Sequence, residues 1–214
     1  MTYRLCIFDV DGTLLDSRNS ITGAFEGMLR DLGMEGTVSR ERFRIGYPLL
    51  EIFEELGITD IERARKYYAR YYYKHIHTEK PFPGIVALLN GLHTRIHMAV
   101  CTNKSIQGAT TTLTNNGLLN YFDVLQTADK GAHKPDGAPF QEILDFYRSA
   151  GTILHRPDCL MVGDSPIDME FAYNAGIDCA FVRWGFYSED QLAHRPTHCF
   201  SSPAELAEMI SGPG

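Results

Sequence analysis

Leu5-Cys-Ile-Phe-Asp9-Val-Asp11-Gly12-Thr13 is the stretch of sequence that decides the fold. Four consecutive apolar residues stand directly before two aspartates, a glycine and a threonine. An apolar run without polar alternation is typical of a parallel strand that is covered on both faces. We therefore expect a buried strand near the start of the chain, with polar side chains at its carboxyl end.

Four further apolar runs resemble the first and are separated by segments of helical length. The runs begin at Met98, Phe122, Cys159 and Cys179. Helices are expected near 85–93, 105–116, 137–149 and 166–175. Alternation of this kind predicts a doubly wound α/β domain, a Rossmann-like parallel sheet with right-handed crossovers.

The interval between residues 15 and 80 interrupts this alternation. It contains no convincing strand, and three or four helices are expected there, including one over Glu62–Ile76 and one over Leu49–Leu56. Tyrosines recur at helical spacing along the first of these, which predicts a packing face rather than a stacking platform. We divide the chain into a core, residues 1–14 and 81–214, and a helical cap, residues 15–80.

Composition and charge narrow the class of protein. The net charge is −7, so the average surface would repel nucleic acid, and a nucleic-acid partner is not expected. No apolar run approaches the ~18 residues that span a bilayer. The N-terminus becomes acidic after a few apolar residues, unlike a signal peptide, so we expect a cytoplasmic protein away from membranes. The five cysteines show no disulfide or zinc spacing, and we expect them reduced.

Polar side chains follow four of the predicted strands. These are Asp9 and Asp11 after the first, where Gly12 follows them, Thr102 and Asn103 after the second, Lys134 after the third, and Asp164 and Asp168 after the fourth. Ligands of open parallel sheets bind beyond the carboxyl ends of the strands. We therefore expect these loops to meet at one site.

A divalent cation is needed to make such a site stable. Asp9 and Asp164 would repel each other by about 4 kcal/mol at ~4 Å and an effective dielectric near 20. An all-oxygen ligand set that leaves room for waters and phosphate suits Mg²⁺. Lys134, the Thr102 hydroxyl and the backbone amides near Gly12 would then hold the oxygens of a phosphate group.

In order, the four motifs resemble those of the haloacid dehalogenase superfamily, and the helical insertion stands where that superfamily carries its cap. The chain is most similar to the phosphoglycolate phosphatase group. This resemblance implies that Asp9 is the nucleophile, forming an aspartyl-phosphate, and also a metal ligand. It implies that Asp11 protonates the leaving oxygen and later activates water, while its backbone carbonyl binds the metal.

The resemblance also assigns the remaining matched residues. Thr102 and Lys134 would orient and neutralise the phosphoryl oxygens, beside the phosphate-binding positions Gly12 and Asn103. Asp164 would bind Mg²⁺ directly and Asp168 would support the metal site from behind. Ser165 and Asp168 are also a plain helix start, and the two roles are compatible.

The substrate expected from this resemblance is a small phosphorylated metabolite, with 2-phosphoglycolate as the specific hypothesis. Arg44, beside a turn of the cap, is the residue expected to pair with its carboxylate. A pyrophosphatase and a phosphosugar mutase of the same superfamily remain open, although Ile21 stands near the position where mutases usually carry histidine. Non-enzymatic alternatives are a phospho-receiver-like domain and a protein that only binds a phosphorylated ligand.

Overall fold

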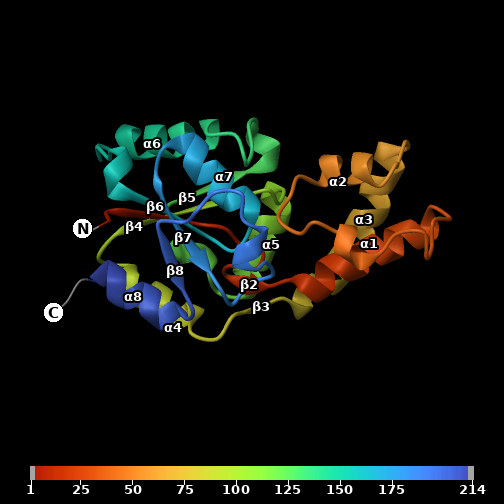
Figure 1. Cartoon of the computed structure of the whole chain (residues 1–214), viewed down its shortest axis with the longest axis horizontal. Helices are drawn as coiled ribbons and strands as arrows, with labels where there is room; N and C mark the ends of the chain where they lie inside the picture. Colours follow the sequence, from red (N-terminus) through yellow and green to blue (C-terminus); the bar gives the residue numbers. More distant parts are fainter. Residues whose placement is uncertain (1–2, 212–214) are drawn as a thin grey trace.

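The computed structural model describes residues 3–211 as an α/β core joined to a smaller helical unit (Figure 1). The core contains a six-stranded parallel sheet with the strand order β5-β4-β1-β6-β7-β8. Its strands are β1 (Leu5–Phe8), β4 (His97–Thr102), β5 (Val124–Thr127), β6 (Cys159–Gly163), β7 (Asp178–Val182) and β8 (His198–Phe200). The predicted doubly wound fold is confirmed. The order reverses at β1, so a crevice is expected beyond its carboxyl end.

Helices cover both faces of the sheet. They are α4 (Ile85–Leu92), α5 (Ile106–Asn115), α6 (Ala138–Ser149), α7 (Pro166–Ala175) and α8 (Pro203–Ser211). Side chains alternate across a strand, so Leu5 and Ile7 pack with α6 and α7, whereas Cys6 and Phe8 pack with α4, α5 and α8. Burial on both faces explains why the strands are continuous apolar runs. The five cysteines are free thiols, as expected.

Three helices, α1 (Arg18–Asp31), α2 (Leu49–Glu55) and α3 (Ile61–His75), form the unit on the right of Figure 1, which we call the cap. They surround a hydrophobic cluster of their own that includes Phe25 and Phe53. Asp60 caps α3 by accepting a hydrogen bond from the Arg63 amide. The tyrosines of α3 pack into this cluster, so the predicted packing face is confirmed.

Two short segments link the cap to the core. β2 (Leu15–Asp16) and β3 (Lys80–Pro81) pair antiparallel, with Leu15 opposite Pro81. The sequence did not predict this ladder, because two residues per strand are too few to produce a pattern. The ladder holds both crossings of the chain side by side, at the base of the cap. Within residues 3–211, no helix is both long and apolar enough to cross a bilayer.

Candidate active site

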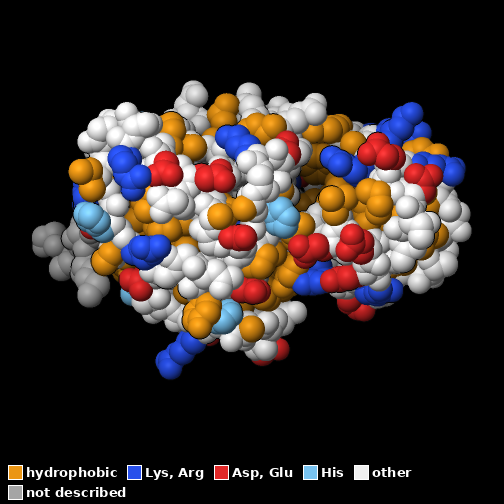
Figure 2. All heavy atoms as spheres, turned by 90° about the horizontal axis from the view of Figure 1, so that it is seen from above, with side chains coloured by type: hydrophobic (Ala, Val, Ile, Leu, Met, Phe, Trp, Pro, Cys, Tyr) orange, Lys and Arg blue, Asp and Glu red, His pale blue; other side chains and the backbone are white. Residues whose placement is uncertain are grey.

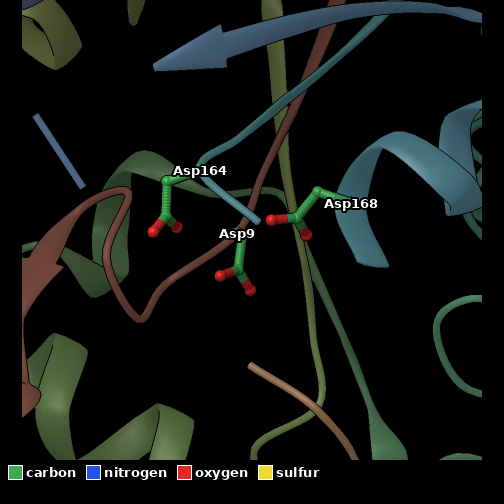
Figure 3. Close-up of side chains that lie close together, drawn as sticks. All are labelled: Asp9, Asp164 and Asp168. Atoms are coloured by element: carbon green, nitrogen blue, oxygen red, sulfur yellow. The ribbon is translucent and has the colours of Figure 1, made fainter. Parts of the chain in front are cut away.

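Three buried aspartates lie together at the carboxyl end of the sheet. Asp9 follows β1, Asp164 follows β6, and Asp168 lies in the first turn of α7; Figure 3 shows their carboxylates gathered there. One carboxylate oxygen from each lies within 4.8 Å of the others. All three residues are at most 1% exposed. The convergence expected from adjacent strand ends is therefore present in the structure.

A buried lysine compensates part of this negative charge. Lys134 Nζ lies 2.8 Å from Asp9 Oδ1 and 2.6 Å from Asp168 Oδ1. Burial alone would lower the pKa of Lys134, but Asp168 and Asp9 raise it above its usual value, so the side chain stays cationic. One ammonium group thus contacts two carboxylates, those of Asp9 and Asp168, and it does not contact Asp164.

Two of the three aspartates have a raised pKa. Burial raises the pKa of Asp9 to about 7, although the Lys134 ammonium lowers it in part. Burial, with Asp168 and Asp9 nearby, raises the pKa of Asp164 well above its usual range. Ionisation of all three aspartates would place more negative charge in this buried cluster than one lysine can balance, and a bound cation would relieve that condition.

The donor set fits a hard divalent cation. Asp9 Oδ2 is buried and has no hydrogen-bond partner among residues 3–211. A buried carboxylate oxygen without a donor is unfavourable unless a ligand completes it. Asp164 Oδ1 accepts from the Thr13 hydroxyl at 3.0 Å, and its Oδ2 accepts from the Phe186 amide at 2.7 Å, which fixes the carboxylate toward Asp9. These oxygen donors suit Mg²⁺.

Asp168 has both of its oxygens engaged inside the protein. Its Oδ1 binds Lys134, and its Oδ2 accepts from the Ser165 amide at 3.1 Å and the Ser165 hydroxyl at 2.6 Å. Ser165 and Asp168 form a capping box, with Pro166 at the first turn. The helix start and the contact with Lys134 therefore coexist in one residue. Of the other two acids, Asp9 keeps one oxygen without a partner among residues 3–211, and Asp164 has no contact with Lys134, so these two are better placed to bind a cation directly.

Gly12 allows the loop after β1 to pass close to Asp164. Its φ is +87°, and a Cβ atom at this position would lie 2.3 Å from Asp164 Oδ2. Only glycine satisfies both conditions without strain. The neighbouring Thr13 carbonyl accepts a hydrogen bond from Trp184 Nε1 at 3.0 Å, so the indole fastens the same loop.

The Asp11 side chain contacts a second set of polar and charged groups, at the base of the cap. Its Oδ1 accepts from the Ser17 hydroxyl at 2.5 Å and from Lys104 Nζ at 2.6 Å. Lys104 Nζ also lies 3.8 Å from Oε1 of Glu79, whose side chain is fully buried beside β3. Burial would lower the pKa of Lys104, but Asp11, Tyr72 and Glu79 raise it well above its usual value.

Sequence reasoning missed this second charged network. Lys104 stands in a loop where an ordinary surface lysine is the default expectation, and Glu79 lies in a segment with no pattern. The signal that was available is the place of Lys104, directly after Thr102-Asn103 at the carboxyl end of β4. Its position at one sheet edge made it a candidate on the same grounds as Lys134.

Thr102 and Asn103 occupy the loop between the two networks. Thr102 ends β4 and is buried, and its hydroxyl accepts from the Lys104 amide at 3.3 Å. The Asn103 side-chain amide donates to the carbonyls of Gly46 and Lys134, each at 3.0 Å. Asn103 therefore ties a loop of the cap to the lysine of the core.

Arg44 lies on the cap and is engaged there. Its guanidinium pairs with Glu55 and stacks over the Tyr47 ring, 3.6 Å from the ring centroid. Of these residues, Tyr47 lines the cavity described next. A substrate carboxylate would have to draw Arg44 away from Glu55 before pairing with it.

A cavity of about 670 Å³ lies between cap and core, and Figure 2 shows the hollow between the two units. Asp11, Asn103 and Lys104 line it on the core side, whereas the loop 45–49 and α3 line it on the cap side. Of the site residues expected from the sequence, Asp11 and Asn103 thus line a chamber that is large enough for an organic ligand.

Comparison with known proteins agrees with this geometry. A model of the haloacid dehalogenase-like hydrolase family matches residues 6–182. The chain belongs to that family.

Named relatives cover nearly all of the chain. A probable phosphatase, IndB, of Dickeya dadantii is 34% identical over 88% of this chain and 84% of its own. A 5′-nucleotidase of Pseudomonas aeruginosa is 32% identical over 98% and 96% of the two chains. A phosphoglycolate phosphatase of Aquifex aeolicus is 29% identical over 97% and 96%.

A solved structure, a predicted phosphatase from Clostridium acetobutylicum, superposes with a TM-score of 0.85 at 26% identity, covering 99% of each chain. The resemblance found in the four sequence motifs is confirmed. The chain is an enzyme, a hydrolase of the phosphatase kind.

Proposed function

We propose that this protein is a magnesium-dependent phosphatase that hydrolyses a phosphate monoester of a small metabolite through an aspartyl-phosphate on Asp9. The observation that carries the proposal is the buried Asp9 carboxylate, with Oδ1 on Lys134 and Oδ2 without a partner among residues 3–211. The Asp9 carboxylate is thus held in place by Lys134 and still has a free oxygen that can react.

The Mg²⁺ would be held by the carboxylates of Asp9 and Asp164 and by the backbone carbonyl of Asp11. It would neutralise the phosphate dianion and lower the repulsion between that dianion and the acids. Lys134 holds Asp9 in orientation and adds positive charge beside the transferring group. The Thr102 hydroxyl and the amides of the Gly12 loop would bind the other phosphoryl oxygens.

The reaction then needs two steps on Asp9 and one proton carrier. The Asp9 carboxylate attacks phosphorus, the bond to the alcohol oxygen breaks, and Asp11 gives that oxygen its proton. Asp11 then takes a proton from water, whose oxygen attacks the same phosphorus, and inorganic phosphate leaves with Asp9 regenerated. Because Asp11 lines the cavity, a leaving alcohol held in the cavity would lie next to the carboxyl group that gives it a proton.

2-Phosphoglycolate is the specific substrate proposed from the resemblance, and the names of three relatives, among them the Aquifex aeolicus protein, support it. Arg44 is the residue proposed to receive its carboxylate. The Arg44 contact with Glu55 bears on this proposal, because the pairing must be exchanged for the substrate. The test is the catalytic efficiency of wild type and Arg44→Ala on 2-phosphoglycolate and glycerol phosphate, where only the first should lose activity.

The proposed reaction is tested by metal removal and by Asp9→Asn. Hydrolysis of acetyl phosphate should stop in excess chelator and return with Mg²⁺, whereas Ca²⁺, which prefers a larger and looser shell, should restore little. Asp9→Asn should lower turnover by at least ~10³-fold. Full turnover in chelator, or activity retained by Asp9→Asn, would contradict the proposal.

A further inference from the structure

Glu79 is a buried acid that has no role in the proposed reaction as described so far. It is 1% exposed, lies directly before β3 where the chain returns from the cap to the core, and has Lys104 beside it. We infer that Glu79 is a positioning residue for proton transfer, which acts through Lys104 and fixes the orientation of the Asp11 carboxyl group. This inference rests on the proposed phosphatase reaction, in which Asp11 protonates the leaving alcohol.

Hydrogen bonds hold Glu79 from both units of the molecule. Its Oε1 accepts from the hydroxyl of Ser20, on α1 of the cap, at 2.5 Å, and its Oε2 accepts from the hydroxyl of Thr112, on α5 of the core. Because both oxygens are engaged, the carboxylate cannot rotate without breaking a buried hydrogen bond. Glu79 therefore places a carboxylate at a fixed point at the base of the cap.

Lys104 contacts this carboxylate, Asp11 and an aromatic ring. Its Nζ lies 2.6 Å from Asp11 Oδ1, 3.8 Å from Glu79 Oε1 and 4.9 Å from the centre of the Tyr72 ring. The lysine side chain is only 8% exposed, so water and salt screen these interactions weakly. A lysine has a flexible stem and a point charge, and with one anion alone its ammonium group could take several positions. The second anion and the ring restrict that choice.

The position of the ammonium group determines which oxygen of Asp11 carries the proton. The hydrogen bonds from Lys104 and from the Ser17 hydroxyl both end on Asp11 Oδ1. An oxygen that accepts two hydrogen bonds, one of them from a cation, is the less favourable place for a proton. The proton that Asp11 gives to the leaving alcohol is therefore directed to Oδ2. If Lys104 moved away, the carboxyl group could turn and present the wrong oxygen.

A structural role for Glu79 is the alternative, because a buried lysine needs a compensating charge wherever it lies. The two roles differ in the losses that they predict. A misplaced Asp11 proton slows transfer from alkyl phosphates, whose alcohols are poor leaving groups, more than transfer from acetyl phosphate. Damage to the fold lowers the activity on both kinds of substrate to the same extent.

The first experiment is Glu79→Gln, which keeps the size of the side chain and removes its charge. With Mg²⁺ present, kcat/KM is measured on acetyl phosphate and on 2-phosphoglycolate or glycerol phosphate, whichever the wild type prefers. On the alkyl phosphate it should fall about tenfold or more, toward the ~10²-fold that a 1 Å misplacement can cost, and on acetyl phosphate much less. Equal losses on the two substrates, or no loss on the alkyl phosphate, would overturn the inference.

Glu62→Gln is the matched control for this experiment. Glu62 is an exposed glutamate in the first turn of α3, so the same change of charge is made on the surface of the cap. Its kcat/KM values should equal those of wild type on both substrates. If Glu62→Gln reproduces the selective loss on the alkyl phosphate, the loss belongs to the charge of the cap in general and not to Glu79.

The second experiment is a double-mutant cycle that asks whether Glu79 acts through Lys104. In Lys104→Met the ammonium group is absent, so adding Glu79→Gln should lower kcat/KM on the alkyl phosphate no further. A second loss as large as the one that Glu79→Gln causes in wild type would show that the two residues act independently, and the inference would be wrong.

Thermal unfolding of the same four proteins keeps the inference testable if one variant is poorly folded. Lys104→Met leaves Glu79 as a buried acid without its cation, which is destabilising. Adding Glu79→Gln should therefore raise the melting temperature of Lys104→Met, whereas Glu79→Gln alone should not raise that of wild type. Equal changes of melting temperature in the two backgrounds would show that Glu79 and Lys104 are not coupled, which would overturn the inference.

Failure of the inference differs from failure of the proposed function. If acetyl phosphate is hydrolysed in an Asp9-dependent reaction but Glu79→Gln affects both substrates equally, only the positioning role is wrong. If Asp9→Asn retains wild-type turnover of acetyl phosphate, the phosphatase itself fails and the inference falls with it.

Discussion

Asp164→Asn should stabilise the metal-free protein although it disables the metal site. Asp164 is fully buried beside Asp9 and Asp168, and the Lys134 ammonium contacts only the other two aspartates. Asparagine has almost the same shape. Its oxygen can accept from the Phe186 amide, and its amide can donate to the Thr13 hydroxyl, which also accepts. The substitution therefore removes one buried negative charge and little packing.

The magnitude follows from the spacing of the carboxylates. Two charges 4.8 Å apart repel by about 3 kcal/mol at an effective dielectric of 20. Lys134 offsets roughly one of the two neighbouring acids, so about one such repulsion remains. Loss of a charge-assisted hydrogen bond to Asp164 removes about 1 kcal/mol or more of that gain. The net stabilisation in chelator should be about 1–3 kcal/mol, or roughly 2–12 °C in Tm for a chain of this length.

The assay is thermal unfolding at pH 8.5, in excess chelator and in saturating Mg²⁺. Wild type should gain stability from Mg²⁺, about 2.7 kcal/mol at a hundredfold excess over Kd, and Asp164→Asn should gain little. Asp145→Asn is the control: it removes the same charge from an exposed pair with Arg148 and should change stability by less than about 0.5 kcal/mol. A destabilised Asp164→Asn in chelator, or an equal response to Mg²⁺, would refute the reasoning.

Three further predictions concern the charged networks. Asp11→Asn should lower kcat on alkyl phosphates by about 10²–10⁴-fold, with a smaller loss on acetyl phosphate, whose leaving group needs less protonation; steady-state rates on both measure this. Lys104→Met should lower kcat on alkyl phosphates by about 10–150-fold, because Asp11 loses a charged partner. Lys130→Met changes an exposed lysine and is the control, so kcat should not fall in that variant. Equal losses of kcat in the two variants would count against a role for Lys104. In chelator, the free energy of unfolding should fall as pH rises from about 4 to above 7. The reason is that Asp9, with a pKa of about 7, and Asp164 hold protons in the folded protein, whereas unfolded aspartates, with a pKa near 3.9, have released them. Urea unfolding at several pH values measures this, and a free energy of unfolding that rises with pH would contradict it.

The core was predictable from sequence because strands that are buried on both faces of a sheet have continuous apolar sequences. The runs beginning at Leu5 and Cys159 mark strands whose ends carry Asp9 and Asp164, and neighbouring parallel strands bring such ends together. The edge strand β8 and helix α8 were not predicted. β8 has three residues, His198-Cys-Phe, and its partly exposed side chains give no apolar run.

Contacts between distant segments were the other part that the sequence did not indicate. Nothing near Phe186 suggests that its amide holds Asp164, or that Glu79 accepts from Ser20 and Thr112 across the base of the cap. The α3 tyrosines show the same limit. Their spacing predicted packing, which is confirmed, but only the placement of the cap over the sheet shows that Tyr68 and Tyr72 also face a cavity.

The most direct test of the account is the identity of the residue that carries the phosphoryl group. Asp11→Asn is mixed with acetyl phosphate and Mg²⁺, quenched in acid and reduced with borohydride, which converts an aspartyl-phosphate to homoserine. Peptide mass spectrometry then locates the converted residue. The account predicts homoserine at position 9, abolished by chelator and by Asp9→Asn. Conversion at another aspartate, or turnover with no converted residue at all, would contradict it.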